Sequence, residues 1–223
     1  ARDDYDKAIK FNLFYIYRGY VKSRIGDIKG AVKDYEKAET LKRKYYFVFF
    51  LRGRIKELNK NFKGALKDYD DAINFNKNKT KKLFIKKANI KIEIGEHQAA
   101  IKDLTRAIKF YPANENLYIK RGTEKMAMHN LKSSIDDFNK AIEINSRSRF
   151  AYLSRGKAKE LSAKDYGSIK SKIKYFKDSN KDYKKVIDIS NAGRRYDKRT
   201  TSRIREMISE NEKAIKVINE NLY

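Results

Sequence analysis

The chain has 223 residues, 40% of them apolar, and contains no Cys, which excludes disulfides and thiolate metal sites. No apolar run approaches the roughly 18 residues of a membrane-spanning helix, and a single Pro with 10 Gly favours helices over strands. A net charge of +25 attracts polyanions, although it is spread along the chain and a composition rich in Lys, Asn and Ile also explains it. We expect a soluble, intracellular protein without a cofactor, a metal or a small-molecule substrate.

The first residues of the chain look like a truncated structural unit. The chain opens on Ala1, without an initiator Met or an apolar signal-peptide core, so we interpret it as a fragment or as a mature form. Residues 1–11 have the pattern of the second helix of an incomplete repeat.

A block of 34 or 35 residues recurs five times between about residues 12 and 190. Each block opens on a small residue that is followed by Lys three positions later. The opening residues are Gly19, Gly53, Ala88, Gly122 and Gly156. In the first four blocks an Asp lies 15 positions on, an aromatic residue or Leu 16 positions on, and Ala 19 positions on. Tandem units of this length form solenoids, in which each unit packs on its neighbours.

Each block has the pattern of two amphipathic helices joined by a short turn. In the second block the apolar spacing predicts one helix before residues 59–61 and another after them, with Ala65 and Tyr69 on one face. Gly26 and Gly95 stand at the matching turns of the first and third blocks, where Gly allows the left-handed end of a helix.

The fifth block is longer than the others and is followed by a separate C-terminal segment. It takes 27 residues from Gly156 to Tyr183 where the other blocks take 16. The 11 extra residues equal about three helical turns, so we predict lengthened helices. Residues 191–223 should form a basic loop and a capping helix. The apolar stripe of that helix is Ile204, Met207, Ile208, Ala214, Ile215, Ile218 and Leu222.

Small and charged residues at the repeated positions indicate how the helices pack. Gly or Ala at a crossing lets two backbones approach, and large rings fill the adjoining space. We predict that these rings belong to the first helices, namely Tyr15, Phe49, Phe84, Tyr118 and Tyr152. The recurring Lys or Arg of the first helix should pair with the recurring Asp of the second and bridge the two helices.

The small, small, aromatic, small rhythm at a period of 34, with Pro112 closing the third block, resembles the tetratricopeptide repeat over about residues 12–190. The resemblance implies an all-α, right-handed superhelical solenoid of helix-turn-helix repeats. It also implies a concave groove lined by the first helices and a role as a protein-binding scaffold. In four blocks Arg precedes Gly, as in a variant of the repeat: Arg18, Arg52, Arg121 and Arg155. Ala88 in place of Gly and Ser134 in place of Ala depart from the family pattern.

If first helices line a groove, two residues of each block should face it, one three positions before the opening residue and one directly after it. The apolar set is Ile16, Phe50, Ile85, Ile119 and Leu153. The polar set is Tyr20, Arg54, Asn89, Thr123 and Lys157. Such a surface suits a helix or extended peptide with acidic flanks, so we expect a non-enzymatic scaffold or adaptor with a protein partner. The alternative is that the apolar set is buried within the array.

Two further functions stay open. RNA or DNA could bind the basic surface, with candidate contacts at Arg194, Arg195, Lys198, Arg199, Arg203 and Arg205. The chain could also be a structural subunit of a larger complex. Catalysis is not expected, because His97 and His129 are the only His and stand in separate turns. Chaperone-tail binding is not expected either, because only Lys82 and Lys86 fit the places where that class grips a carboxylate.

Overall fold

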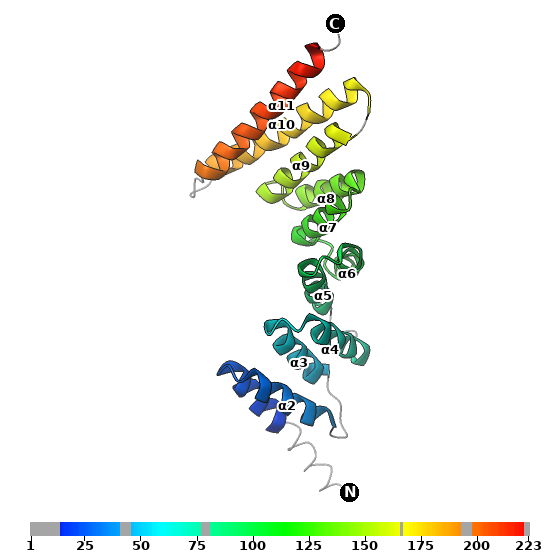
Figure 1. Cartoon of the computed structure of the whole chain (residues 1–223), viewed down its shortest axis with the longest axis vertical. Helices are drawn as coiled ribbons and strands as arrows, with labels where there is room; N and C mark the ends of the chain where they lie inside the picture. Colours follow the sequence, from blue (N-terminus) through cyan, green and yellow to red (C-terminus); the bar gives the residue numbers. More distant parts are fainter. Residues whose placement is uncertain (1–13, 41–45, 77–80, 166, 193–197, 221–223) are drawn as a thin grey trace. The chain divides into compact units, whose positions relative to one another are not determined.

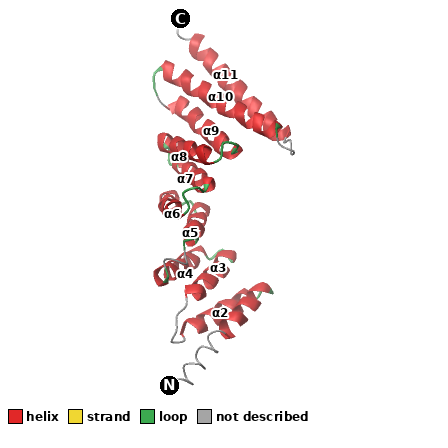
Figure 2. Cartoon of the chain, turned by 180° about the vertical axis from the view of Figure 1, so that it is seen from behind, coloured by secondary structure: helices red, strands yellow, loops and turns green. Residues whose placement is uncertain are grey.

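The computed structural model describes residues 14–40, 46–76, 81–165, 167–192 and 198–220. All regular secondary structure in these ranges is α-helical, as Figure 2 shows, so the expected all-α class is confirmed. No helix in these ranges has the length and apolarity needed to cross a membrane. The helix predicted within residues 1–11 lies outside the described part of the chain.

The chain divides into two compact units, residues 1–95 and residues 96–223. The helices of the first unit are residues 14–24, α2 (Ile28–Thr40), α3 (Tyr46–Leu58), α4 (Phe62–Phe75) and α5 (Leu83–Glu93). Those of the second unit are α6 (His97–Phe110), α7 (Glu115–Ala127), α8 (Leu131–Ile144), α9 (Arg149–Asp165), α10 (Ile169–Asn191) and α11 (Lys198–Glu220). Within each unit successive helices pack against one another, which confirms a tandem array of helix hairpins (Figure 1).

A glycine of the first helix meets a ring of the second helix at four hairpin crossings. The contacts are Gly19 with Tyr35, Gly53 with Tyr69, Gly122 with Phe138 and Gly156 with Tyr183. A Cβ at Gly53 would lie 2.7 Å from the Tyr69 ring, so no larger residue fits there without movement. The ring that contacts each Gly therefore comes from the second helix, and Phe49 of the first helix is buried in the same cluster as Tyr69.

A buried Asp joins the two helices of each of these hairpins, as predicted. In the second hairpin, Asp68 accepts a hydrogen bond of 2.7 Å from Arg52 Nη2 and pairs with Lys56 Nζ at 3.0 Å. The same three-residue cluster forms at Arg18, Lys22 and Asp34, at Arg121, Lys125 and Asp137, and at Arg155, Lys159 and Asp182. Each buried Asp is therefore paired with two cations.

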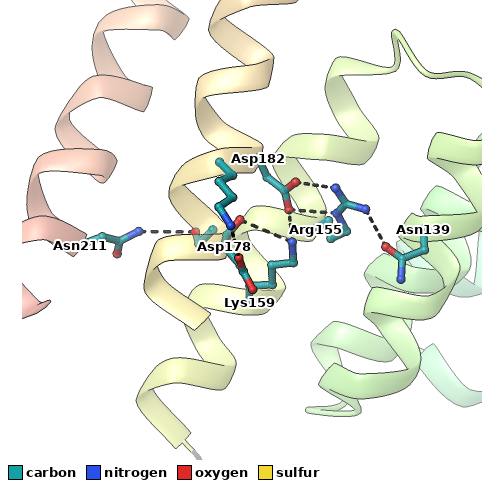
Figure 3. A network of polar contacts seen from close by, with 8 residues as sticks. Asn139, Arg155, Lys159, Asp178, Asp182 and Asn211 are labelled. Carbon is teal, nitrogen blue, oxygen red and sulfur yellow. Dashed lines mark hydrogen bonds and ion pairs between the residues drawn. The ribbon is translucent and has the colours of Figure 1, made fainter. Parts of the chain in front are cut away.

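The arginine of three of these clusters also reaches back to the preceding hairpin. Arg155 Nη1 donates to Asn139 Oδ1 on α8 at 2.7 Å, while its other nitrogens hold Asp182 on α10 (Figure 3). Arg121 Nη1 likewise donates to Thr105 Oγ1 at 3.1 Å. In the first unit Arg52 is hydrogen-bonded to Glu39. A single planar guanidinium therefore joins three helices at each place.

The turn of each regular hairpin contains one residue with positive φ. These residues are Gly26 (87°), Lys60 (60°), Gly95 (77°) and His129 (57°), each seven positions after the opening residue of its block. In the fifth block the matching place is Ala163, which stays in helix α9. The helices α9 and α10 consequently reach 17 and 23 residues, which confirms the predicted lengthening.

The final helix α11 packs along α10 (Figure 1). Ile204 and Ile208 are buried against Tyr183 and Val186 of α10, as expected of a capping helix. Asn211 is also buried, and its Nδ2 donates to Asn180 Oδ1 on α10 at 2.8 Å. The rest of the predicted stripe is only half-buried, and Leu222 lies outside the described residues.

Candidate protein-binding site

One of the five predicted apolar contacts is buried in a hydrophobic core, and the other four are half-buried. Ile16 is 4% exposed and lies in a core cluster with Tyr35 and Val48, which corrects the expectation that it faces a groove. Phe50 is half-buried beside Tyr69, with ring centroids 6.4 Å apart. The remaining members, Ile85, Ile119 and Leu153, are also half-buried. Ile16 is therefore buried as in the alternative, whereas the other four residues keep part of their surface accessible.

The predicted polar contacts are more accessible. Tyr20, Arg54 and Lys157 are exposed, whereas Asn89 and Thr123 are half-buried. Thr123 Oγ1 donates to the backbone carbonyl of Ile119 at 2.9 Å, as is common for Thr within a helix.

Two of the predicted polar contacts, Tyr20 and Arg54, meet at one pocket of the first unit. The pocket lies between the helix of residues 14–24, α2 and α3 and has a volume of about 240 Å³. We call it the Tyr35 pocket; its lining residues are Tyr20, Ser23, Arg24, Tyr35, Leu51, Arg54, Ile55 and Leu58. It combines an apolar wall with two guanidinium groups, as sites that orient a partly charged ligand do.

The polar groups of the Tyr35 pocket are largely uncommitted. Within the described residues neither Arg24 nor Arg54 forms an ion pair, and the buried Tyr35 hydroxyl has no hydrogen-bond partner. Burial raises the pKa of Tyr35 to about 12, while the Ser23 hydroxyl, which lies near the Tyr35 hydroxyl without meeting hydrogen-bond geometry, and the charge of Arg54 act in the opposite direction. The pocket therefore offers two cations and one neutral donor.

Comparison with known proteins identifies the type of repeat. Residues 82–114 match the family model described as tetratricopeptide repeat. MamA from Desulfovibrio magneticus is 14% identical with a TM-score of 0.66, and the match covers 82% of this chain and 97% of that one. A tetratricopeptide repeat protein from Parabacteroides merdae is 17% identical with a TM-score of 0.64, over 95% and 78% of the two chains. The fold is a tetratricopeptide-type repeat array.

A third solved structure of this type is titled YrrB, a TPR protein with an unusual peptide-binding site. It is 15% identical with a TM-score of 0.65, over 86% of this chain and 90% of that one. At such identities the likeness concerns the fold alone. No curated protein sequence matches the chain.

The basic candidates of the tetratricopeptide array lie at the start of α11. Lys198, Arg199, Arg203 and Arg205 are exposed there, whereas Arg194 and Arg195 lie outside the described residues. The two histidines have local partners: His97 Nδ1 lies 2.6 Å from Glu124 and His129 Nδ1 lies 3.2 Å from Asp165. Among the residues with described positions, no group of three or more His, Cys, Asp or Glu is placed to hold a metal ion.

Sequence reasoning named only Tyr20 and Arg54 among the eight residues of the Tyr35 pocket, and it missed Ser23, Arg24, Tyr35, Leu51, Ile55 and Leu58. Tyr35 stands at the aromatic position of its block, and its ring is buried. The missed signal was its hydroxyl, because a buried hydroxyl needs a partner and the sequence provides none at the expected spacing.

Proposed function

We propose that the chain is a non-enzymatic scaffold or adaptor that binds a segment of a partner protein on the first-helix surface of its first two hairpins. The observation that carries this proposal is the Tyr35 pocket, where Tyr20 and Arg54 lie together. Leu51, Ile55 and Leu58 give the partner an apolar contact, and Arg24 and Arg54 favour acidic groups beside it. Repeat arrays present extended surfaces of this kind to protein partners.

A selection experiment tests this function. A phage library of random 12-residue peptides is panned against the whole chain at 150 mM salt, and the enriched peptide is measured by fluorescence anisotropy. We expect an enriched sequence with acidic and apolar residues, and at least a tenfold weaker Kd for the double variant Tyr20→Ala with Arg54→Ala. The matched control is Thr123→Ala with Lys157→Ala, which changes the same positions in other blocks and should leave the Kd unchanged.

Two results contradict the proposal. Panning that enriches no sequence indicates that the surface is not a peptide site. An enriched peptide that binds the double variant with the wild-type Kd indicates a site elsewhere on the chain.

The four exposed cations of α11 favour RNA binding as a second candidate function. Phosphate contacts release counterions, so affinity for a single-stranded RNA should fall steeply as salt rises. The variant with Lys198, Arg199, Arg203 and Arg205 changed to Glu should then lose binding, measured by anisotropy with a labelled 20-nucleotide RNA. Equal binding by this variant contradicts the candidate.

A further inference from the structure

Two hairpins satisfy the hydroxyl of their crossing Tyr with a carboxylate from the first helix. Tyr69 Oη donates to Glu57, which also pairs with Lys86 Nζ at 3.0 Å. Tyr183 Oη donates to Glu160 Oε2 at 2.9 Å. Both Glu residues stand four positions after the opening Gly of their block. The same arrangement of donor and acceptor therefore occurs in each of the two units.

Two other blocks lack the hydroxyl and also lack the carboxylate. Phe138 and Leu104 occupy the place of the Tyr, and Met126 and Ile92 occupy the place of the Glu. In these four blocks the residues at the two places match. Where the crossing residue is Tyr, the other place holds Glu, and where the crossing residue is Phe or Leu, the other place holds Met or Ile.

The first hairpin breaks this agreement. It has the hydroxyl of Tyr35, but the place of the Glu is taken by Ser23. Ser23 Oγ donates to the backbone carbonyl of Tyr20 at 2.6 Å. Tyr35 is fully buried and, among the described residues, its hydroxyl has no partner. An unpaired buried hydroxyl is destabilising, so a group that brings an acceptor to Tyr35 would stabilise the chain.

The surroundings of Tyr35 suit that ligand. The Tyr35 pocket of about 240 Å³ has room for a side chain, since a water molecule takes about 30 Å³ in the liquid. Arg24 and Arg54 line it, and neither has a carboxylate partner among the described residues. In the second hairpin a cation from the following first helix, Lys86, holds Glu57. In the first hairpin the corresponding place holds Leu51, and the cation that the following helix α3 brings to the pocket is Arg54, three positions later.

We propose that the Tyr35 pocket binds a Glu side chain of the partner protein, which occupies the place that Glu57 and Glu160 fill in the other hairpins. The Tyr35 hydroxyl donates to the incoming carboxylate, Arg24 and Arg54 pair with it, and Leu51 and Ile55 contact its methylene groups. This inference rests on the proposed function, because it names the chemistry that the partner segment must carry.

The test uses a small probe, so that it does not depend on a known partner. N-acetyl-glutamate N-methylamide, which carries only the side-chain carboxylate, is titrated into the whole chain, and the Nε–Hε NMR signals of Arg24 and Arg54 are followed. We expect saturable shifts of both signals and at least tenfold weaker binding of the glutamine analogue. Arg205 on α11 is the control cation, and its signal should not shift.

Substitutions in the pocket sharpen the test. Ser23→Glu supplies the missing carboxylate from within, so it should abolish probe binding and raise the melting temperature, while Ser23→Gln should do neither. Tyr35→Phe should weaken binding several-fold without changing the fold, and it carries the test alone if Ser23→Glu does not fold.

The proposal is overturned if the glutamine analogue binds as well, if Ser23→Glu leaves binding intact, or if Arg205 shifts in parallel with Arg24 and Arg54. Stronger binding of N-acetyl-leucine, whose carboxylate is terminal, also overturns it, because the pocket would then take a chain end. Failure here combined with successful panning leaves the scaffold function standing. Success here with no panned peptide shows a carboxylate site without the proposed partner.

Discussion

The first and second hairpins of the chain build the same helix crossing and complete it differently. In each, a Gly of the first helix meets a Tyr ring of the second, and an Asp beside that Tyr binds an Arg and a Lys. In the second hairpin Glu57 accepts from the Tyr69 hydroxyl and Arg52 is only 8% exposed. In the first hairpin the Tyr35 hydroxyl is unpaired within the described residues, and Arg18 is 40% exposed. One copy of a repeated unit can therefore keep the helix packing of the others while it lacks the carboxylate contact to its Tyr and has an open pocket.

The largest contrast between the two hairpins is expected on removing the central Asp. Asp68→Ala leaves Arg52 and Lys56 without their shared carboxylate in a buried place, which costs about 3–5 kcal/mol of the free energy of unfolding. Asp34→Ala should cost less, because water reaches the exposed Arg18. Urea unfolding of the two variants measures both values. Equal losses would contradict the stated difference in burial.

Removing the Tyr hydroxyl should give effects of different sign. Tyr69→Phe takes a donor from Glu57 and should cost about 1.5–3 kcal/mol, as for other hydrogen bonds to charged groups. Tyr35→Phe removes a buried hydroxyl without a described partner, so stability should stay the same or rise. A loss of the same size in both variants, measured by urea unfolding at pH 7, would show that Tyr35 is satisfied after all.

The turns of the two hairpins differ in the residue that holds the left-handed conformation. A Cβ at Gly26 would meet nothing within 4 Å, so Gly26→Ala should cost only the backbone strain of φ 87°, about 1–2 kcal/mol. Lys60→Gly relieves that strain in the second turn and should raise stability, because its ion pair with Glu93 is exposed and contributes little. Thermal unfolding with these two variants should give shifts of opposite direction.

The smallest expected effect concerns alkaline pH. Burial raises the pKa of Tyr35 to about 12 from its ordinary value of 10.0, so the folded chain holds this proton after the unfolded chain has released it. The resulting stability is fully present below pH 10 and is lost as the pH rises toward 12. Between pH 9 and pH 11 the free energy of unfolding of Tyr35→Phe should therefore fall by about 1 kcal/mol less than that of the wild type. Parallel pH profiles in urea unfolding would contradict this.

The features that repeat in every block were predictable from the sequence. The position of each Gly, Lys and Asp indicated hairpins and interhelical ion pairs, and the 11 extra residues of the fifth block indicated the long helices α9 and α10. Such features follow from helical spacing, which a single block already displays.

The candidate site was harder to predict, because it depends on how neighbouring hairpins pack. Ile16 has the spacing of a surface residue but is buried by Val48 and other residues of its cluster. The Tyr35 pocket depends on a difference at one place, where Ser23 stands instead of the Glu of the two other blocks with a crossing Tyr, and a search for shared features misses it. A comparison of the individual blocks reveals such a difference, whereas the pattern shared by all blocks does not contain it.

The arginine that reaches back to the preceding hairpin has a consequence for how such a chain can change its length. Its acceptor is a carboxylate at Glu39, a hydroxyl at Thr105 and an amide at Asn139, so oxygens of three different kinds serve. A block duplicated in tandem would bring its own connector and would need no matching substitution in the copy before it. Gain or loss of a whole block should therefore keep the contacts between neighbouring hairpins, whereas insertion of a few residues within a block should disrupt them.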